Sequence, residues 1–297
     1  MSFTEEQEAL RATVRKALER NRKPWQALCE IGVTALMIPE EYGGLGAGLT
    51  EIQIVAEELG RVLSDVPFLS TVLATQALLS TEDEPARKRL LPRLAGGATG
   101  ALALTGEYVI DGDTAEILVA SKENTLYEVD SAHKRHTPTM DETRRLASVE
   151  IVDAHRIGEV NLNQVRDVAL AVSAAEQAGA AARALHITVE FCKQRKQFGR
   201  AIGGFQALKH RMADLYVLIE TARSAAYAAT DERMAAIAKV YCSEAFCAVA
   251  AEMIQLHGGI AITWEHEAHR YFKRAHLSAQ LFGAPHLHLT RVGQTPA

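Results

Sequence analysis

The chain has 297 residues, of which 48% are hydrophobic and 23% charged, and its formal net charge is -5. This composition is typical of a globular protein with a large core, and the negative charge argues against nucleic-acid binding. No apolar run looks long enough to span a membrane, the polar start is unlike a secretory signal, and the four cysteines form no CxxC pair. We therefore expect a cytoplasmic protein without disulfides or a zinc site.

Residues 1–95 are expected to form a helical domain. Ser2 and Glu5 have the spacing of a capping box before a first amphipathic helix. Glycines then exclude a stable helix from the segment IPEEYGGLGAGLT. Thr50 and Gln53 suit the start of a second helix, along which apolar residues recur at helical spacing.

Residues 96–157 have a different pattern, which predicts a small strand-rich domain. Apolar and polar residues alternate over short runs, namely EILVA, TLYEV and ASVEIV. Asp111, Gly112 and Pro138 are turn-forming residues between such runs.

Residues 158–297 are rich in alanine and are predicted to be helical. A continuous apolar stripe with spacings of three and four residues runs along one expected helix, formed by Phe205, Leu208, Met212, Leu215, Ile219 and Ala222. A second helix is expected from about Ile237 onward. Long helices with short connections are typical of an antiparallel bundle.

Two segments of this last region carry a family resemblance. They are RKQFGRAIGGFQALKHRMADL, residues 195–215, and QLHGGIAITWEHEAHRYFKRA, residues 255–275. Both resemble the C-terminal helical domain of acyl-CoA dehydrogenases, while IPEEYGGLG and PTMDETRRLASVEI resemble that family's N-terminal loop and the end of its β domain. The resemblance implies a mainly α fold, with an N-terminal helical domain, a reduced middle β domain and a C-terminal four-helix bundle.

The resemblance also implies a reaction and a cofactor. In this family a glutamate removes the α-proton of an acyl-CoA, the β-hydrogen leaves as hydride to FAD, and an electron-transfer flavoprotein reoxidises the flavin. The RxxFG and QxxGG segments contact the FAD of a neighbouring subunit, which implies a cofactor-binding role for Arg195, Gln197, Phe198, Gln206, Gln255, Gly258 and Gly259. A guanidinium pairs well with phosphate, and paired glycines allow close backbone approach. Without the resemblance, Arg195 would be interpreted as a solvated charge at a helix end, and the resemblance favours the cofactor-binding role. For Phe198 and Phe205, composition alone makes core packing as plausible as cofactor contact.

Two expected features are missing from the sequence. The family's flavin-ring segment should follow Leu104 and Thr105, but GEYVIDGDTAEILVA follows directly, which indicates a deletion. The catalytic glutamate is absent from both of the family's positions, because Gly283 occupies one and Ala169 or Leu170 the other. A general base needs a titratable group within reach, so we expect no catalytic residue on this chain.

Three functional hypotheses follow. The leading one is the short, non-catalytic subunit of a heteromeric α2β2 acyl-CoA dehydrogenase, similar to those that degrade sterols in actinobacteria, with a full-length subunit carrying the glutamate. The alternatives are a self-sufficient homomeric dehydrogenase that uses Glu265 or Glu267, and a flavin-free acyl-CoA-binding scaffold. His257, His266 and His269 are interpreted as structural, so no metal site is expected.

Overall fold

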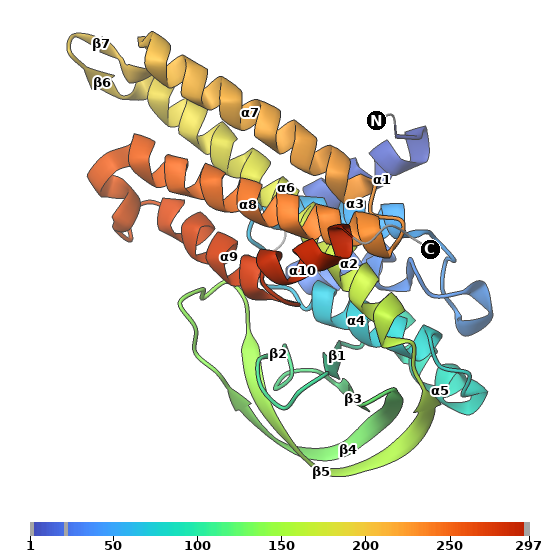
Figure 1. Cartoon of the computed structure of the whole chain (residues 1–297). Coiled ribbons are helices and arrows are strands. Elements are labelled where there is room, and N and C mark those ends of the chain that lie inside the picture. Colours follow the sequence, from blue (N-terminus) through green and yellow to red (C-terminus); the bar gives the residue numbers. More distant parts are fainter. Residues whose placement is uncertain (1–2, 21–22, 294–297) are drawn as a thin grey trace. The chain divides into compact units, whose positions relative to one another are not determined.

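The computed structural model describes residues 3–20 and 23–293, so Ser2 lies outside the described residues. The contacts divide this part of the chain into two compact units. We call residues 3–56 and 65–172 the sheet unit, and residues 57–64 and 173–293 the bundle unit. Figure 1 shows the elements of both units along the chain.

Side-chain hydrogen bonds cap the N-termini of helices α1 (Glu5–Arg20) and α5 (Glu84–Ala95) of the sheet unit, and at α5 the side chain of Asp83 accepts from the amide of Ala86. Thr4 and Gln7 form a reciprocal capping box, with N···O distances of 3.1 and 3.2 Å. The helices of this unit are α1 (Glu5–Arg20), α2 (Pro24–Glu30), η1 (Val33–Ala35), η2 (Glu40–Tyr42), the first part of α3 (Leu49–Arg61), α4 (Phe68–Leu79), α5 (Glu84–Ala95) and the first part of α6 (Leu162–Gln194).

The predicted strand-rich region forms one five-stranded sheet with the order β1-β3-β4-β5-β2. Its strands are β1 (Gly100–Ala103), β2 (Val109–Ile110), β3 (Ile117–Lys122), β4 (Thr125–His136) and β5 (Leu146–Glu159). The three alternating runs in the sequence correspond to β3, β4 and β5, so these strands are confirmed. Only β1 and β3 pair in parallel, while β4 and β5 form a long antiparallel ribbon.

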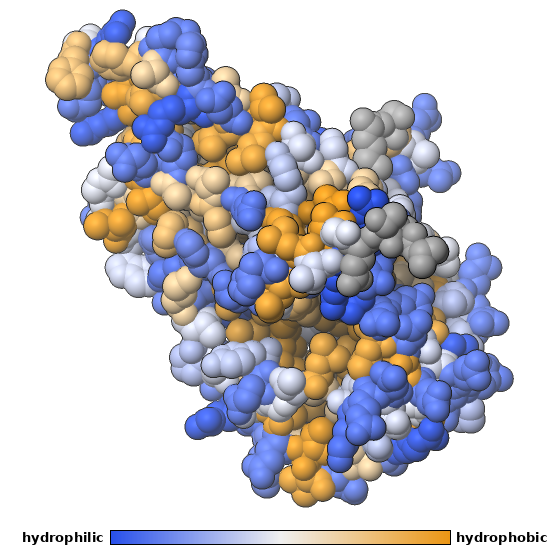
Figure 2. All heavy atoms as spheres, viewed as in Figure 1, coloured by the Kyte–Doolittle hydropathy of each residue, from blue (hydrophilic) through white to orange (hydrophobic). Residues whose placement is uncertain are grey.

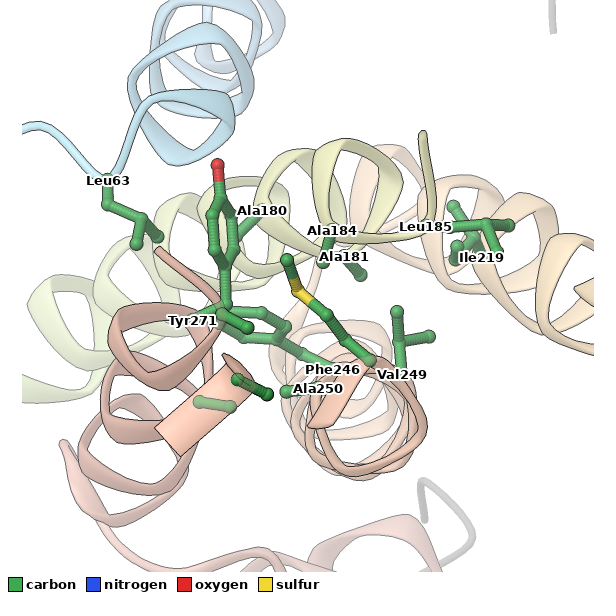
Figure 3. Close-up of a cluster of buried hydrophobic side chains, with 14 residues drawn as sticks. Leu63, Ala180, Ala181, Ala184, Leu185, Ile219, Phe246, Val249, Ala250 and Tyr271 are labelled. Atoms are coloured by element: carbon green, nitrogen blue, oxygen red, sulfur yellow. The ribbon is translucent and has the colours of Figure 1, made fainter. Parts of the chain in front are cut away.

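The bundle unit confirms the predicted C-terminal helices. It contains the rest of α3 and α6, the hairpin β6 (Lys196–Gln197) and β7 (Arg200–Ala201), then η3 (Ile202–Gly204), α7 (Gln206–Tyr227), α8 (Glu232–His257), η4 (Gly258–Ile262), α9 (Ala268–Gln280) and α10 (Pro285–Val292). Phe246 and Tyr271 pack in its core with the small residues Ala180, Ala181 and Ala184 of α6 (Figure 3), and Met253 belongs to the same cluster. The predicted apolar stripe lies along α7, except that Phe205 is its N-cap residue.

Two glycines allow α3 and α6 to cross at backbone contact within the bundle unit. A Cβ atom on Gly60 would lie 2.0 Å from the backbone oxygen of Glu176, and one on Gly179 would lie 2.0 Å from that of Glu57. Each glycine therefore meets a backbone oxygen of the opposite helix, where a larger residue has no space. The side chains beside the crossing are paired, because the carboxylate of Glu176 accepts a hydrogen bond from Arg274 at 2.6 Å.

The expectation that no helix is long and apolar enough to cross a membrane is wrong. By length and composition alone, one helical stretch of the described residues, 232–262, passes that test. One such helix is weak support for a membrane protein, because the core helix of a soluble protein passes the same test. Within the bundle unit this stretch supplies core residues such as Phe246 and Met253.

Candidate functional site

Two stacked aromatic rings lie at or just before the starts of the two segments that resemble acyl-CoA dehydrogenases. We call residues 195–215 the first motif and residues 255–275 the second motif, and the stack places the starts of both at one end of the bundle unit. Phe191 lies in the last turn of α6, just before Arg195, and His257 is the last residue of α8, just before Gly258. Their ring centroids are 4.2 Å apart, with an interplanar angle of 29°. The C-terminal ends of α6 and α8 therefore lie together, at the end of the unit that carries the β6–β7 hairpin (Figure 1).

The hairpin presents an aromatic side chain to solvent at its tip. Phe198 and Gly199 form the two-residue turn between the strands, and both have positive φ, 51° and 76°. The Phe198 side chain is 91% exposed, which rules out the core-packing interpretation. Its ring meets that of Phe205 edge-on at 6.2 Å, and the Arg200 guanidinium lies 4.0 Å from the Phe205 ring centroid. The hairpin is thus held by aromatic contacts outside the core.

The remaining motif residues are also accessible. Arg195, Gln197, Gln206 and Gln255 are exposed. Among the described residues no carboxylate forms an ion pair with Arg195, whereas the Gln206 amide nitrogen lies 2.8 Å from Nε2 of His210. A cation without a protein partner suits a ligand that brings its own anionic oxygens.

The backbone of the second motif is open in the same way. Gly258 has a φ of 65°, and no atom lies within 4 Å of a Cβ placed on Gly258 or Gly259. The peptide groups of this segment can therefore approach a ligand closely. Arg195 and the two glycines fit the phosphate-bearing part of a dinucleotide such as FAD, whose chemistry the family resemblance implies.

His257 is buried beneath this surface. Its Nδ1 donates a hydrogen bond to the backbone oxygen of Met253 at 2.7 Å, and its Nε2 is buried without a partner in the described part of the chain. Burial lowers the pKa of His257, the bond to Met253 opposes this, and nearby His266 lowers it further. Sequence reasoning set both histidines aside and missed Phe191. An aromatic residue one turn before the first motif was the available signal.

The two positions expected for a catalytic glutamate carry no titratable group. Ala169 and Leu170 are buried in α6. The α9–α10 turn, residues 280–284, contains no carboxylate, and a Cβ on Gly283 would lie 3.0 Å from Nε2 of His288. Because Gly283 also has a φ of 100°, a glutamate there would be strained as well as crowded.

The carboxylates of the runner-up hypothesis lie on a surface turn. Glu265 and Glu267 are both exposed, immediately before α9. The turn exposes both side chains to water, whereas a general base acts on a substrate proton held within hydrogen-bond reach. No group of three or more His, Cys, Asp or Glu side chains suited to a metal occurs among residues 3–20 and 23–293.

The sheet unit contains a separate polar groove of about 680 Å³, next to the end of β5. Its lining includes one cation, Arg156, and three carboxylates, Glu82, Asp83 and Glu159. The hydroxyl of Thr81 is fully buried there and has no hydrogen-bond partner among the described residues. The excess of carboxylates disfavours a highly phosphorylated ligand, so this groove offers no charge-based anchor for the phosphates of coenzyme A.

Two family models match most of the chain. The model described as "Acyl-CoA dehydrogenase, N-terminal domain" matches residues 4–98, and the model described as "Acyl-CoA dehydrogenase, C-terminal domain" matches residues 167–295. The chain belongs to the acyl-CoA dehydrogenase family, and the fold expected from the resemblance is confirmed. Residues 99–166, which include the whole sheet, lie between the two matched ranges.

The chain is similar to individual acyl-CoA dehydrogenases over nearly its whole length. The chain is 45% identical to "Acyl-CoA dehydrogenase IpdE2" of Mycolicibacterium smegmatis, over 98% of each chain, and 47% identical to the IpdE2 of Mycobacterium tuberculosis, over 95% of this chain and 90% of that one. Among solved structures, the "Tcur3481-Tcur3483 steroid ACAD G363A variant" shares 26% identity, with a TM-score of 0.87 over 97% of each chain. The ChsE4-ChsE5 complex from Mycobacterium tuberculosis has the same fold, with a TM-score of 0.90, 24% identity and coverage of 100% and 99%.

Proposed function

We propose that this chain is the non-catalytic subunit of a heteromeric, FAD-dependent acyl-CoA dehydrogenase. Its partner is a full-length family member that holds the flavin ring and carries the proton-abstracting glutamate. The reaction is the α,β-dehydrogenation of an acyl-CoA, with a steroid-derived acyl group as the substrate class. The relatives support that class, because one similar structure is titled a steroid enzyme and names two gene products.

The proposal rests on the exposed residues of the two motifs, which include no catalytic base. The Phe191–His257 stack joins the two motifs, and the motif side chains and glycines face outward rather than into this chain. A group that binds within one chain would be enclosed by that chain. The outward arrangement suits a cofactor held by a neighbouring subunit.

Two features missing from this chain also support a partner subunit that binds the flavin ring and carries the base. By the family resemblance, Gly283 and Ala169 hold the two positions of the base. The resemblance also implies that the flavin-ring segment is deleted after Thr105, and only the five residues 104–108 connect β1 to β2. We further propose that the chain has an N-terminal helical domain, a middle β domain and a C-terminal helical domain, with boundaries at about residues 95 and 157. We also place the protein in the cytoplasm, with an electron-transfer flavoprotein as the electron acceptor.

The roles of this chain's residues follow from their chemistry. FAD would supply the hydride-accepting chemistry of this reaction. Arg195 would neutralise phosphate oxygens, and the open peptide groups at Gly258 and Gly259 would hydrogen-bond to the same part of the cofactor. Gln197, Gln206 and Gln255 supply uncharged donors and acceptors, while Phe198 covers an apolar face. These residues bind and orient the cofactor, and proton removal belongs to the partner.

The partner surface includes the outer side of α7. Tyr216 and Val217 are 59% and 65% exposed on this helix, although its opposite side contributes Ile219 and Ala222 to the core. Figure 2 shows apolar residues reaching the surface over α7 and α8. Apolar surface of this kind is typical of permanent subunit contacts, which supports an obligate association.

The test compares the chain purified alone with the chain co-expressed with the full-length acyl-CoA dehydrogenase encoded nearest to it. We expect the chain alone to be colourless and inactive, and the co-purified complex to be yellow and to dehydrogenate a steroid acyl-CoA. A yellow, active preparation of this chain alone would support the homomeric alternative. A complex that remains colourless and inactive would support the scaffold alternative.

A further inference from the structure

The bundle unit contains an apolar pocket that the proposed function does not use. It has a volume of about 370 Å³ and lies where the end of α8, η4 and α9 meet. Its lining residues are Ile254, Ile262, Trp264, His269, Phe272 and Lys273. Small-molecule sites typically have about 300–1,000 Å³ and a mainly apolar lining with a few polar groups, and this pocket fits that description.

The pocket leaves large apolar side chains in contact with water. Ile262 is 75% exposed and Trp264 is 69% exposed, and they are neighbours on the same short segment. A clustered apolar surface of this kind marks a binding site more often than an isolated exposed residue does. Covering the two side chains with an apolar ligand would remove that surface from water.

A cation in the pocket lining, Lys273, favours a ligand with a negative charge. The Lys273 ammonium lies 4.7 Å from the centroid of the Trp264 ring. Within the described part of the chain it forms no ion pair with a carboxylate. The His269 ring meets the same indole edge-on, at 4.7 Å. An ammonium without a carboxylate partner, beside an apolar cavity, is complementary to a ligand with an anionic end and an apolar body.

We propose that this pocket binds an amphiphilic carboxylate. The alkyl or alicyclic body lies against Ile254, Ile262 and Phe272, and the carboxylate accepts a hydrogen bond from the Lys273 ammonium. All the lining residues lie within 254–273 of one unit, so the site is complete in a single chain. The pocket lies in the same segment as Gly258 and Gly259, but binding of a carboxylate there needs no flavin and can be measured on this chain alone. A protein segment that only covers the apolar surface is the outcome to be tested against it.

Trp264 provides a direct measurement of binding. The chain has two tryptophans, and the other one, Trp25, donates a hydrogen bond to the backbone oxygen of Gly97 in the sheet unit. In the full-length Trp25→Phe variant, Trp264 is therefore the only indole that reports on ligands. We expect decanoate to shift its emission in a saturable way, and to bind about tenfold more tightly than decanol, because only decanoate forms a charge-assisted bond.

Variants of the lysine separate the charge from the packing. Lys273→Met keeps an unbranched apolar side chain and should reduce the affinity for decanoate about tenfold without changing that for decanol. Lys273→Arg should retain the preference for decanoate. Lys209→Met removes a positive charge from exposed α7 and serves as the matched control, with no change expected.

Two results would overturn the proposal. One is the absence of saturable decanoate binding by fluorescence and by calorimetry on the unsubstituted chain, which also covers the case that Trp25→Phe does not fold. The other is equal affinity for decanoate, decanol and decyltrimethylammonium, because the pocket would then be a simple apolar surface of the kind that a protein segment covers.

Discussion

At the scale of single residues, Arg195 has the most specific expected role. Its guanidinium is exposed and forms no ion pair with a carboxylate in the described part of the chain, so its removal should cost the folded chain little. In the assembled complex, Arg195→Ala should increase flavin loss about tenfold or more, because a charge-assisted bond to phosphate contributes about 1.5–3 kcal/mol. Flavin fluorescence released on dilution measures this loss.

The control for this prediction is Arg233→Ala. Arg233 is an exposed arginine in the first turn of α8, outside both motifs. It should leave flavin retention unchanged while removing the same charge. Full flavin occupancy of the Arg195→Ala complex after dilution would show that Arg195 does not bind the cofactor.

The buried His257 side chain should make the free energy of unfolding depend on pH. Burial is the largest cause of its lowered pKa, so the folded protein binds a proton less readily than the unfolded chain does. The unfolded chain therefore takes up more protons as the pH falls through about 6.5, and the free energy of unfolding should decrease from about pH 7.5 to pH 5.5. Urea unfolding at the two pH values measures the change.

Substitution identifies the group responsible for this dependence. His257→Phe can keep the stack on Phe191 and should reduce the pH dependence, although His288, whose pKa is also lowered by burial, maintains part of it. His286→Ala, at an exposed position on α10, should have no effect. An unchanged pH dependence in His257→Phe would exclude His257 as a source.

At the scale of elements, the crossing of α3 and α6 depends on Gly60 and Gly179. Alanine normally stabilises a helix by about 1 kcal/mol relative to glycine. Here Gly60→Ala and Gly179→Ala should each lower the free energy of unfolding by about 3 kcal/mol or more, because the new Cβ would meet backbone that cannot move aside. Chemical denaturation measures both variants.

Gly293 is the matched glycine at a helix end with space around it. The nearest atom to a Cβ placed there is 3.9 Å away. Gly293→Ala should change the stability by less than about 0.5 kcal/mol. If Gly60→Ala were as stable as this control, the two helices would not be in backbone contact.

The helices and strands were the features that the sequence predicted best. The period of apolar residues predicted α7, and alternation predicted β3, β4 and β5, because each pattern reports the face that an element buries. The hairpin tip at Phe198 could not be placed by this means, since an aromatic residue is usually interpreted as core. The Phe191–His257 stack was also missed, because it joins helix ends that lie far apart in the sequence.

At the scale of the whole molecule, the proposed assembly contains two copies of this 32.3 kDa chain and two of its partner. We expect two flavins per tetramer rather than four, because each flavin needs one ring-binding chain and one chain with the Arg195 and Gly258 motifs. Sedimentation mass and flavin absorbance per tetramer measure both quantities. Four flavins per tetramer would contradict the division of roles between the subunits.

The helices α3 and α6 also limit how this protein can be recombined with its relatives. Each of them runs through both the sheet unit and the bundle unit, so the boundaries between the units at residues 56/57 and 172/173 fall inside helices. A chimera that exchanges one unit must therefore join two helices in mid-course, although Gly60 and Gly179, which both belong to the bundle unit, stay together. Exchange of a whole unit should therefore be tolerated only where both helices keep their register through the joins at residues 56/57 and 172/173.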